Sequence, residues 1–566
     1  MNRLPQEIID HIVWWLPVPK SIHRRNGLPA SPIRPSIASV SEKFRHAVER
    51  LTFHELHIKT SELNRFDEIL SGAGSYRRRF LTRLNVIVIL REYGGSKYPT
   101  WEFAVDREAN NHAATAGMHQ LLYVLSGWES DLRLELTLEA QSPSDPGALT
   151  SRQIGQRWEE IGNGTRYRFE HERYQYSLTE ILNVDKMPFV PCVRTVHFHG
   201  QRQSRQFSPK AALALVTRFL QVQTVRTEWR EPYWFPDLLN AMRRQLTDSL
   251  KSTHFPPTLD ELVFELHPPN RISGNLTTSP NPKPDRLCRV LHQAINLNHV
   301  AHLRFTGEVD PSLFWPYQPL EKPEPFWQSM KKLEITMAQN STSTEWYQRT
   351  NYNKWSQKTI ARYSNIEFPV NHAGLPAPGH GSAQEAKRAH RYVEAMFQHE
   401  RTIYALTYRT LVHGGFRDDN DDNGSDENDT ESSAQDGGNS DDADESKYEY
   451  DDARVHEMLE SCEVNEPPMA RLLDTMMKAM LQMRRLESVR LKGCLSEMWC
   501  FEFYAPGVPS KYDAKSEATP SYARFILPKR HFWIPGEEIL SGFRNMATEK
   551  YGQQPAVIWV EHIWRN

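Results

Sequence analysis

The sequence predicts a mixed protein of the α+β or α/β class. We expect a small N-terminal helical module, then an irregular array of strands and helices, and a C-terminal αβ cap. Two observations lead to this prediction. Apolar residues spaced three and four apart dominate the N-terminal segment, as in amphipathic helices. Further along, a short apolar-x-x-apolar-x-apolar pattern recurs between helical stretches, and its alternating end is typical of a strand.

Composition indicates a large chain with a substantial core and no membrane segment. Apolar residues make up 39% of the 566 residues, but no run approaches the ~18–20 uncharged apolar residues of a membrane span. The first apolar stretch contains Glu7, Asp10 and His11, unlike the core of a signal peptide. The five cysteines are scattered and form no CxxC pair. We therefore expect an intracellular protein of the nucleus or cytoplasm.

Two amphipathic helices are expected in the first sixty residues. The first opens at Leu4-Pro5, where proline suits the first turn, and stops at Pro17. Its apolar stripe consists of Ile8, Ile9, Ile12, Val13 and Leu16. The second is expected to begin near Ser36, with a stripe of Ile37, Val40, Phe44, Val48 and Leu51. Helices this short need a partner surface for their apolar faces.

These two helices follow the residue pattern of a known family. Leu4-Pro5-Gln6-Glu7 and the later Val40-Ser41-Glu42-Lys43-Phe44-Arg45 resemble the two ends of the F-box, although the connector 20–35 is longer than the usual one. The resemblance implies that the module lies in a groove of a Skp1-like linker protein and, through it, joins a cullin. By position, it implies that the Skp1-binding residues are Leu4, Pro5, Ile8, Ile12, Leu16, Pro17, Val40 and Phe44. The alternative is an ordinary helical hairpin packed on its own domain.

Strand patterns and helical patterns alternate in the long remainder. The recurring strand pattern covers 81–86, 193–198, 259–264, 300–305, 330–335 and 486–491, and 132–138 alternates strictly. Helical patterns cover 62–70, 211–220, 236–250, 285–297 and 469–486, with Ser208-Pro209 as an expected helix start. Strand and helix in repeated alternation is the plan of a degenerate leucine-rich-repeat-like (LRR-like) array. An ordinary α/β sheet of buried strands is the alternative.

The C-terminal part is expected to close this array. Strands at 498–504, 523–527 and 556–560 and a helix at 537–546 form the predicted αβ cap. The layout is similar to that of fungal F-box proteins, with which we associate the stretches 310–316, 532–533 and 557–559. The predicted domains are an F-box at 1–60, an LRR-like region at 61–337, a helical insertion at 338–413, an acidic disordered insert at 414–452, and the last repeat with its cap at 453–566.

The acidic insert conceals a charge asymmetry. The chain carries a net charge of -3, yet residues 418–452 hold 16 acidic residues and one lysine, so the other 531 residues carry +12. Such a block cannot bury enough apolar surface to offset the entropy lost on ordering. A solvated loop is the favoured interpretation, and docking on a basic face or partner is the alternative.

Known catalytic motifs are missing from the sequence. It contains no Walker loop, no G-x-G-x-x-G after a strand and no G-x-S-x-G elbow. Cys494 and Cys500 have no histidine at ligand spacing, so no zinc site is expected there. His197 and His199 alternate on one strand; we favour exposed strand histidines over a metal site or an acid–base pair. Lys and Arg do not cluster with aromatic residues, so no nucleic-acid contact is expected.

The sequence therefore predicts a non-catalytic adaptor without metal or cofactor. On the F-box resemblance, it holds an unknown protein substrate near the ligase machinery of a Skp1–cullin–F-box (SCF) ubiquitin ligase. If the substrate binds the strands, the polar strand positions His197, Glu265, Arg304, Glu334 and Arg490 are the candidates. A Skp1-binding scaffold outside any ligase and an enzyme with an unrecognised site are the alternatives.

Overall fold

The computed structural model describes most of the predicted strands and helices. The described residues are 4–15, 35–94, 102–145, 148–149, 153, 177–200, 205–231, 236–267, 285–315, 327–338, 348–350, 462–493, 500–513, 519–528 and 535–560. The acidic insert and nearly all of the predicted helical insertion, including its expected helix at 382–411, lie outside these ranges.

Twelve strands of the described chain form one sheet, and their order in space is their order in sequence. The first nine are β1 (Glu55–Lys59), β2 (Arg83–Ile89), β3 (Leu134–Gln141), β4 (Val193–Phe198), β5 (Thr224–Arg230), β6 (Glu261–His267), β7 (His302–Gly307), β8 (Lys332–Met337) and β11 (Ser488–Gly493). Each of these is parallel to the next. The last three are β12 (Cys500–Tyr504), β13 (Arg524–Pro528) and β14 (Ala556–Val560). β12 is antiparallel to both of its neighbours, and β13 is parallel to β14.

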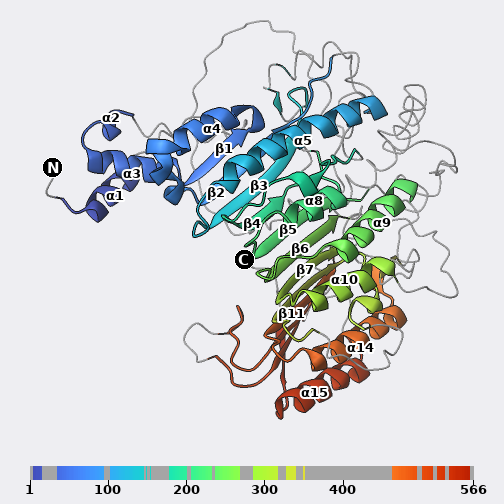
Figure 1. Ribbon diagram of the computed structural model, residues 1–566. Helices are drawn as coiled ribbons and strands as arrows, with labels where there is room; N and C mark the ends of the chain where they lie inside the picture. The colour runs from blue at the N-terminus through green and yellow to red at the C-terminus, as the bar shows by residue number, and fades with distance from the viewer. Residues whose placement is uncertain are drawn as a thin grey trace, which may run out of the picture.

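Helices cover one face of this sheet (Figure 1). They are α5 (Ala104–Ser126), α8 (Pro209–Val216), α9 (Pro236–Ser252), α10 (Arg286–Leu297), α14 (Glu466–Gln482) and α15 (Glu537–Tyr551), with α4 (Leu63–Leu70) beside β1. The short 3-10 helices η1 (Thr60–Glu62), η2 (Gly72–Phe80), η5 (Val184–Lys186) and η6 (Pro311–Leu313) join these elements. The helices α1 (Gln6–Trp15), α2 (Pro35–Ala38) and α3 (Glu42–Thr52) stand at one end, beyond β1 (Figure 1).

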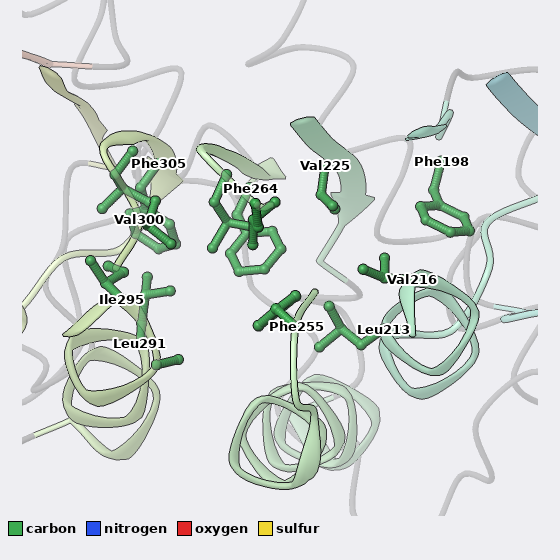
Figure 2. Packing of buried hydrophobic residues seen from close by; sticks show 14 of the residues in the cluster. Phe198, Leu213, Val216, Val225, Phe255, Phe264, Leu291, Ile295, Val300 and Phe305 are labelled. Atoms are coloured by element: carbon green, nitrogen blue, oxygen red, sulfur yellow. The ribbon is translucent and has the colours of Figure 1, made fainter. Parts of the chain in front are cut away.

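The core lies between the sheet and its helices. Alternate strand residues such as Val225, Phe264 and Phe305 point toward the helix residues Val216 and Leu291 (Figure 2). Each such side chain, fully buried, contributes roughly 1.5–3 kcal/mol. Most of the opposite strand positions carry polar side chains, with Ile87, Ile89 and Val263 among the exceptions, and the face they form is called the open face below.

Local chemistry accounts for several helix starts. Ser208 caps α8 by accepting a hydrogen bond from the amide of Ala211, and Pro209 is the first helical residue, as predicted. Asp285 caps α10 in the same way through the amide of Cys288. The prediction of one helix from Ser36 onward was wrong. The chain breaks between α2 and α3, where Ser41 adopts an extended conformation and accepts from the amide of Phe44.

Every predicted strand segment overlaps a strand of the sheet, whereas one strand of the sheet and one helix over it were missed. β5 follows the same pattern as the others, but buried Thr227 stands where the last apolar residue was expected. α5 was missed because its first half is rich in alanine and polar residues and shows no apolar stripe. β1 lies within the predicted module 1–60 yet pairs with β2 of the sheet.

Two short strands lie at the borders of the long segment 351–461. β9 (Gln348–Thr350), inside the insertion predicted as helical, pairs antiparallel with β10 (Cys462–Val464). The described residues on either side of this segment therefore lie side by side. In the C-terminal part predicted as a cap, β12, β13, α15 and β14 lie where two strands, a helix and a strand were expected.

Candidate functional site

The N-terminal helices have a small core of their own. Ile9 and Val13 of α1 are buried against Ala47 and Val48 of α3, and this cluster is separate from the main core. Polar contacts add to the packing. The Gln6 amide donates to the carbonyl of Lys43 over 3.1 Å, and the Asp10 carboxylate pairs with Arg50 over 3.0 Å. α1 and α3 therefore form a small unit with a partner for only part of their apolar surface.

A second apolar surface of this unit remains open. Leu4, Ile8 and Ile12 are 38%, 48% and 40% exposed, and Val40, between α2 and α3, is 53% exposed. At 100° per residue, the apolar positions from Leu4 to Val13 span about half the circumference of α1. One half of this arc faces α3, and the other half faces outward. We call Leu4, Ile8, Ile12 and Val40 the open apolar surface; Trp14 is also exposed, on another side of the helix.

The predicted Skp1-binding residues divide into three groups. Leu4, Ile8, Ile12 and Val40 form the open apolar surface, with Pro5 exposed beside them. Phe44 is half-buried against the small core, so it supports the helices from behind. Leu16 and Pro17 lie outside the described residues.

The unit is joined to the array through α3 and η2. Arg77 donates a 2.7 Å hydrogen bond to the Glu49 carboxylate, which also accepts from the Tyr76 hydroxyl at 2.5 Å. The Arg77 guanidinium lies 5.3 Å from the ring centre of Phe53. Burial raises the pKa of Glu49, but the hydrogen bonds from Arg77 and Tyr76 outweigh it and hold that pKa below its ordinary value.

The open face of the sheet is the second candidate surface. Four of the five predicted substrate-binding residues lie in one row across it. The strand register places His197 beside Arg226, and Arg304 beside Glu334, which in turn lies beside Arg490. Glu265 lies two residues further along β6 on the same face, since β6 residue Val263 pairs with Arg304. The structure thus brings all five onto one surface.

Many of these side chains are paired with their neighbours. Arg304 contacts Glu334 over 2.9 Å, Arg490 contacts Glu502 over 3.0 Å, and His197 contacts Glu228 over 3.0 Å. Such cross-strand pairs neutralise the face without making it apolar. The surface is therefore suited to a polar partner.

The open face ends at the cap. Glu502 of β12 and Arg524 of β13 are buried, although both occupy open-face positions. Arg524 contacts Asp513 and the carbonyl of Val508, both in the segment that follows β12. That segment covers β12 and β13, so the accessible part of the face runs from β1 to β11.

Sequence reasoning missed the partner of the two strand histidines. His197 and His199 lie on the same side, as predicted, with ring centres 5.0 Å apart. They are half-buried rather than exposed, and both contact Glu228 of the next strand. The alternation of polar residues along β5 could have indicated that Glu228 lies on the open face. Only the pairing of β4 with β5 identifies it as the neighbour of His197 and His199.

Comparison with known proteins adds no relative. The chain has no significant match among family models, curated proteins or solved structures. No helix in the described ranges combines the length and apolar character needed to cross a lipid bilayer. The geometry of the open apolar surface and of the open face is therefore the basis for a functional proposal.

Proposed function

We propose that this chain is a substrate adaptor of an SCF-type ubiquitin ligase. In this proposal the N-terminal module binds a Skp1-like linker and, through it, a cullin. The array holds a protein substrate and supplies no reacting group. The open apolar surface of the N-terminal helices is the observation that carries the proposal.

The exposure of this surface supports partner binding over an ordinary hairpin. A hairpin packed on its own domain would cover Ile8 and Ile12, yet both lie outward while their neighbours Ile9 and Val13 are buried. Exposed apolar side chains gathered on one helix are typical of a binding site. The family resemblance of residues 1–60 supplies the identity of the partner, a Skp1-like linker that receives helices in a groove.

The sheet supports a repeat array as the substrate-binding part. Nine described strands, β1 to β8 and β11, are parallel neighbours in sequence order, whereas a doubly wound α/β sheet reverses its strand order. Helices on a single face and an open polar face are features of LRR-like solenoids, which bind partners along their strands. We propose His197, Glu265, Arg304, Glu334 and Arg490 as substrate contacts on this face.

Such an adaptor acts through effective concentration. Holding a substrate beside a charged ubiquitin-conjugating enzyme makes the attack of a substrate lysine effectively intramolecular. The distance between the open apolar surface and the open face then decides which lysines are reached.

The experiment measures the affinity of the full chain for a purified Skp1-family linker. The test variant is Ile8→Ser with Ile12→Ser. The matched control is Val105→Ser with Tyr123→Ser on α5, whose side chains are 68% and 70% exposed. Loss of two isoleucines at ~1.5–3 kcal/mol each predicts at least about 100-fold weaker binding for the test variant. The control should bind like the wild type.

Equal affinity of the test variant and the wild type would overturn the proposal. Circular dichroism should be unchanged in both variants, since the four side chains are exposed. Purification from cells then separates the two Skp1-binding roles. Recovery of the linker together with a cullin supports the ligase adaptor, and recovery of the linker alone supports the scaffold.

A further inference from the structure

A cluster of two histidines and a glutamate lies near the carboxyl ends of β4 and β5. Nε2 of His197 is 3.0 Å from one Glu228 oxygen, and Nδ1 of His199 is 3.3 Å from the other. One donor atom from each of the three residues lies within 4.8 Å of the others. We propose that His197, His199 and Glu228 bind one divalent transition-metal ion, with Zn²⁺ as the best fit. The inference does not depend on the proposed ligase function.

The strand geometry holds these donors in place. His197 is on β4, His199 directly follows it, and both side chains point to the open face because they are two residues apart. Glu228 is on the adjacent parallel strand β5. A tetrahedral Zn²⁺ with bonds of ~2.0–2.1 Å separates neighbouring donors by about 3.4 Å. The observed spacings between the histidines and Glu228 are close to this value.

Further groups orient the cluster. Oε1 of Glu139, on β3, lies 3.8 Å from Nε2 of His199. This is longer than a hydrogen bond, but it places a carboxylate next to the second nitrogen of a ligand histidine, which is where metal sites commonly have one. The amide of Gly200 donates to Glu228 over 3.4 Å. A Cβ at this glycine would lie 2.3 Å from the Glu228 carbonyl oxygen, so only glycine permits this approach.

Electrostatics also favour a cation here. Glu228 lies beside Glu265 in the strand register, and Glu139 flanks the cluster on the other side. Arg226 and Arg230 flank Glu228 on the same face of β5, and the guanidinium of Arg226 lies 3.9 Å from Glu261 of β6. The cluster therefore lies among carboxylates that attract a cation.

The donor set selects the class of metal. Imidazole nitrogen suits Zn²⁺ and its transition-metal neighbours, whereas Mg²⁺ and Ca²⁺ prefer oxygen ligands. Three protein donors leave one tetrahedral position for water or for a side chain of a bound partner. Since the cluster lies on the open face, a partner there has access to this fourth position.

The test uses Co²⁺ as a spectroscopic probe on the full chain. Excess Mg²⁺ is included so that the carboxylates of 418–452 do not contribute. The wild type should give the strong visible absorption of tetrahedral Co²⁺ at one ion per chain, and Zn²⁺ should displace it. The control His267→Ala removes another strand histidine, which pairs with Glu265 over 3.5 Å, and should leave the signal intact.

Three variants test whether these residues bind the metal. The double variant His197→Ala with His199→Ala should lose the signal, and Glu228→Gln, which keeps the side-chain shape, should weaken binding at least tenfold. Glu139→Gln should weaken it about 10- to 100-fold. A wild type without tetrahedral Co²⁺ absorption, or a Glu228→Gln protein that binds like the wild type, would overturn the site.

Discussion

Arg77 of η2 donates a 2.7 Å hydrogen bond to Glu49 of α3 and so joins the N-terminal helices to the strand array. The side chains of both residues are mostly buried, with 26% and 12% exposure. This contact sets the direction in which the open apolar surface projects from the array. Loss of this hydrogen bond should weaken the attachment of the N-terminal helices to the array.

The first prediction concerns acid sensitivity of this contact. The pKa of Glu49 lies below its ordinary 4.5 in the folded chain, so the unfolded state binds the proton more readily. The stabilisation is complete above about pH 4.5 and is lost as the pH falls through the lowered folded pKa. The protection factors of α3 amides, which compare exchange with the intrinsic rate at the same pH, should therefore fall on acidification more steeply in the wild type than in Glu49→Gln. Parallel pH profiles for the two proteins would contradict this.

The second prediction compares a buried and an exposed arginine. Arg205 contacts Glu102 and Asp145, and all three side chains are at most 2% exposed. Arg205→Met leaves two buried carboxylates without their cation and should destabilise the array by about 3–5 kcal/mol. Arg304→Met breaks an exposed pair with Glu334 and should cost about 0–1 kcal/mol. Urea unfolding followed by tryptophan fluorescence measures both, and similar midpoints would refute the ranking.

The third prediction concerns the close approach of β4 and β5. Gly200→Ala places a methyl group 2.3 Å from the Glu228 carbonyl oxygen and should destabilise by about 1–3 kcal/mol through overpacking. Gly94→Ala is the control, because a Cβ there meets no atom within 4 Å. Thermal unfolding should show a lower midpoint for Gly200→Ala only. A midpoint equal to that of the control would show that the strands can separate without cost.

The fourth prediction concerns thiol reactivity. Cys192, Cys288 and Cys500 are buried, and burial raises the pKa of Cys192 and Cys500 to about 12. The thiolate is the reactive form, so these three thiols should resist an aromatic disulfide reagent at pH 8. Of the five cysteines, at most Cys462 and Cys494 should react before the chain is unfolded in urea. Detection of labelled Cys192 by peptide mapping of the native chain would contradict the burial of this thiol.

Much of the array was predictable because each strand repeats its own local pattern. Leu84, Val196 and Leu303 are all buried at the positions that the apolar-x-x-apolar-x-apolar pattern indicates. β5 was not predicted because Thr227 occupies a position where the pattern requires an apolar residue. Thr227 is buried by its neighbours in the folded chain and not because it is apolar. The break before α3 was not predicted because it depends on one residue. Ser41 adopts an extended conformation and caps α3, and the apolar spacing on either side gives no sign of this.

The sequence by itself determined the alternation of strands and helices and the apolar excess of the N-terminal helices. Both follow from side-chain periodicity, which is a property of neighbouring residues. Only the tertiary structure decided which half of the α1 arc is covered and that His197 and His199 meet Glu228. Those relationships join residues far apart in the chain, and strand register and helix packing, rather than local spacing, bring them together.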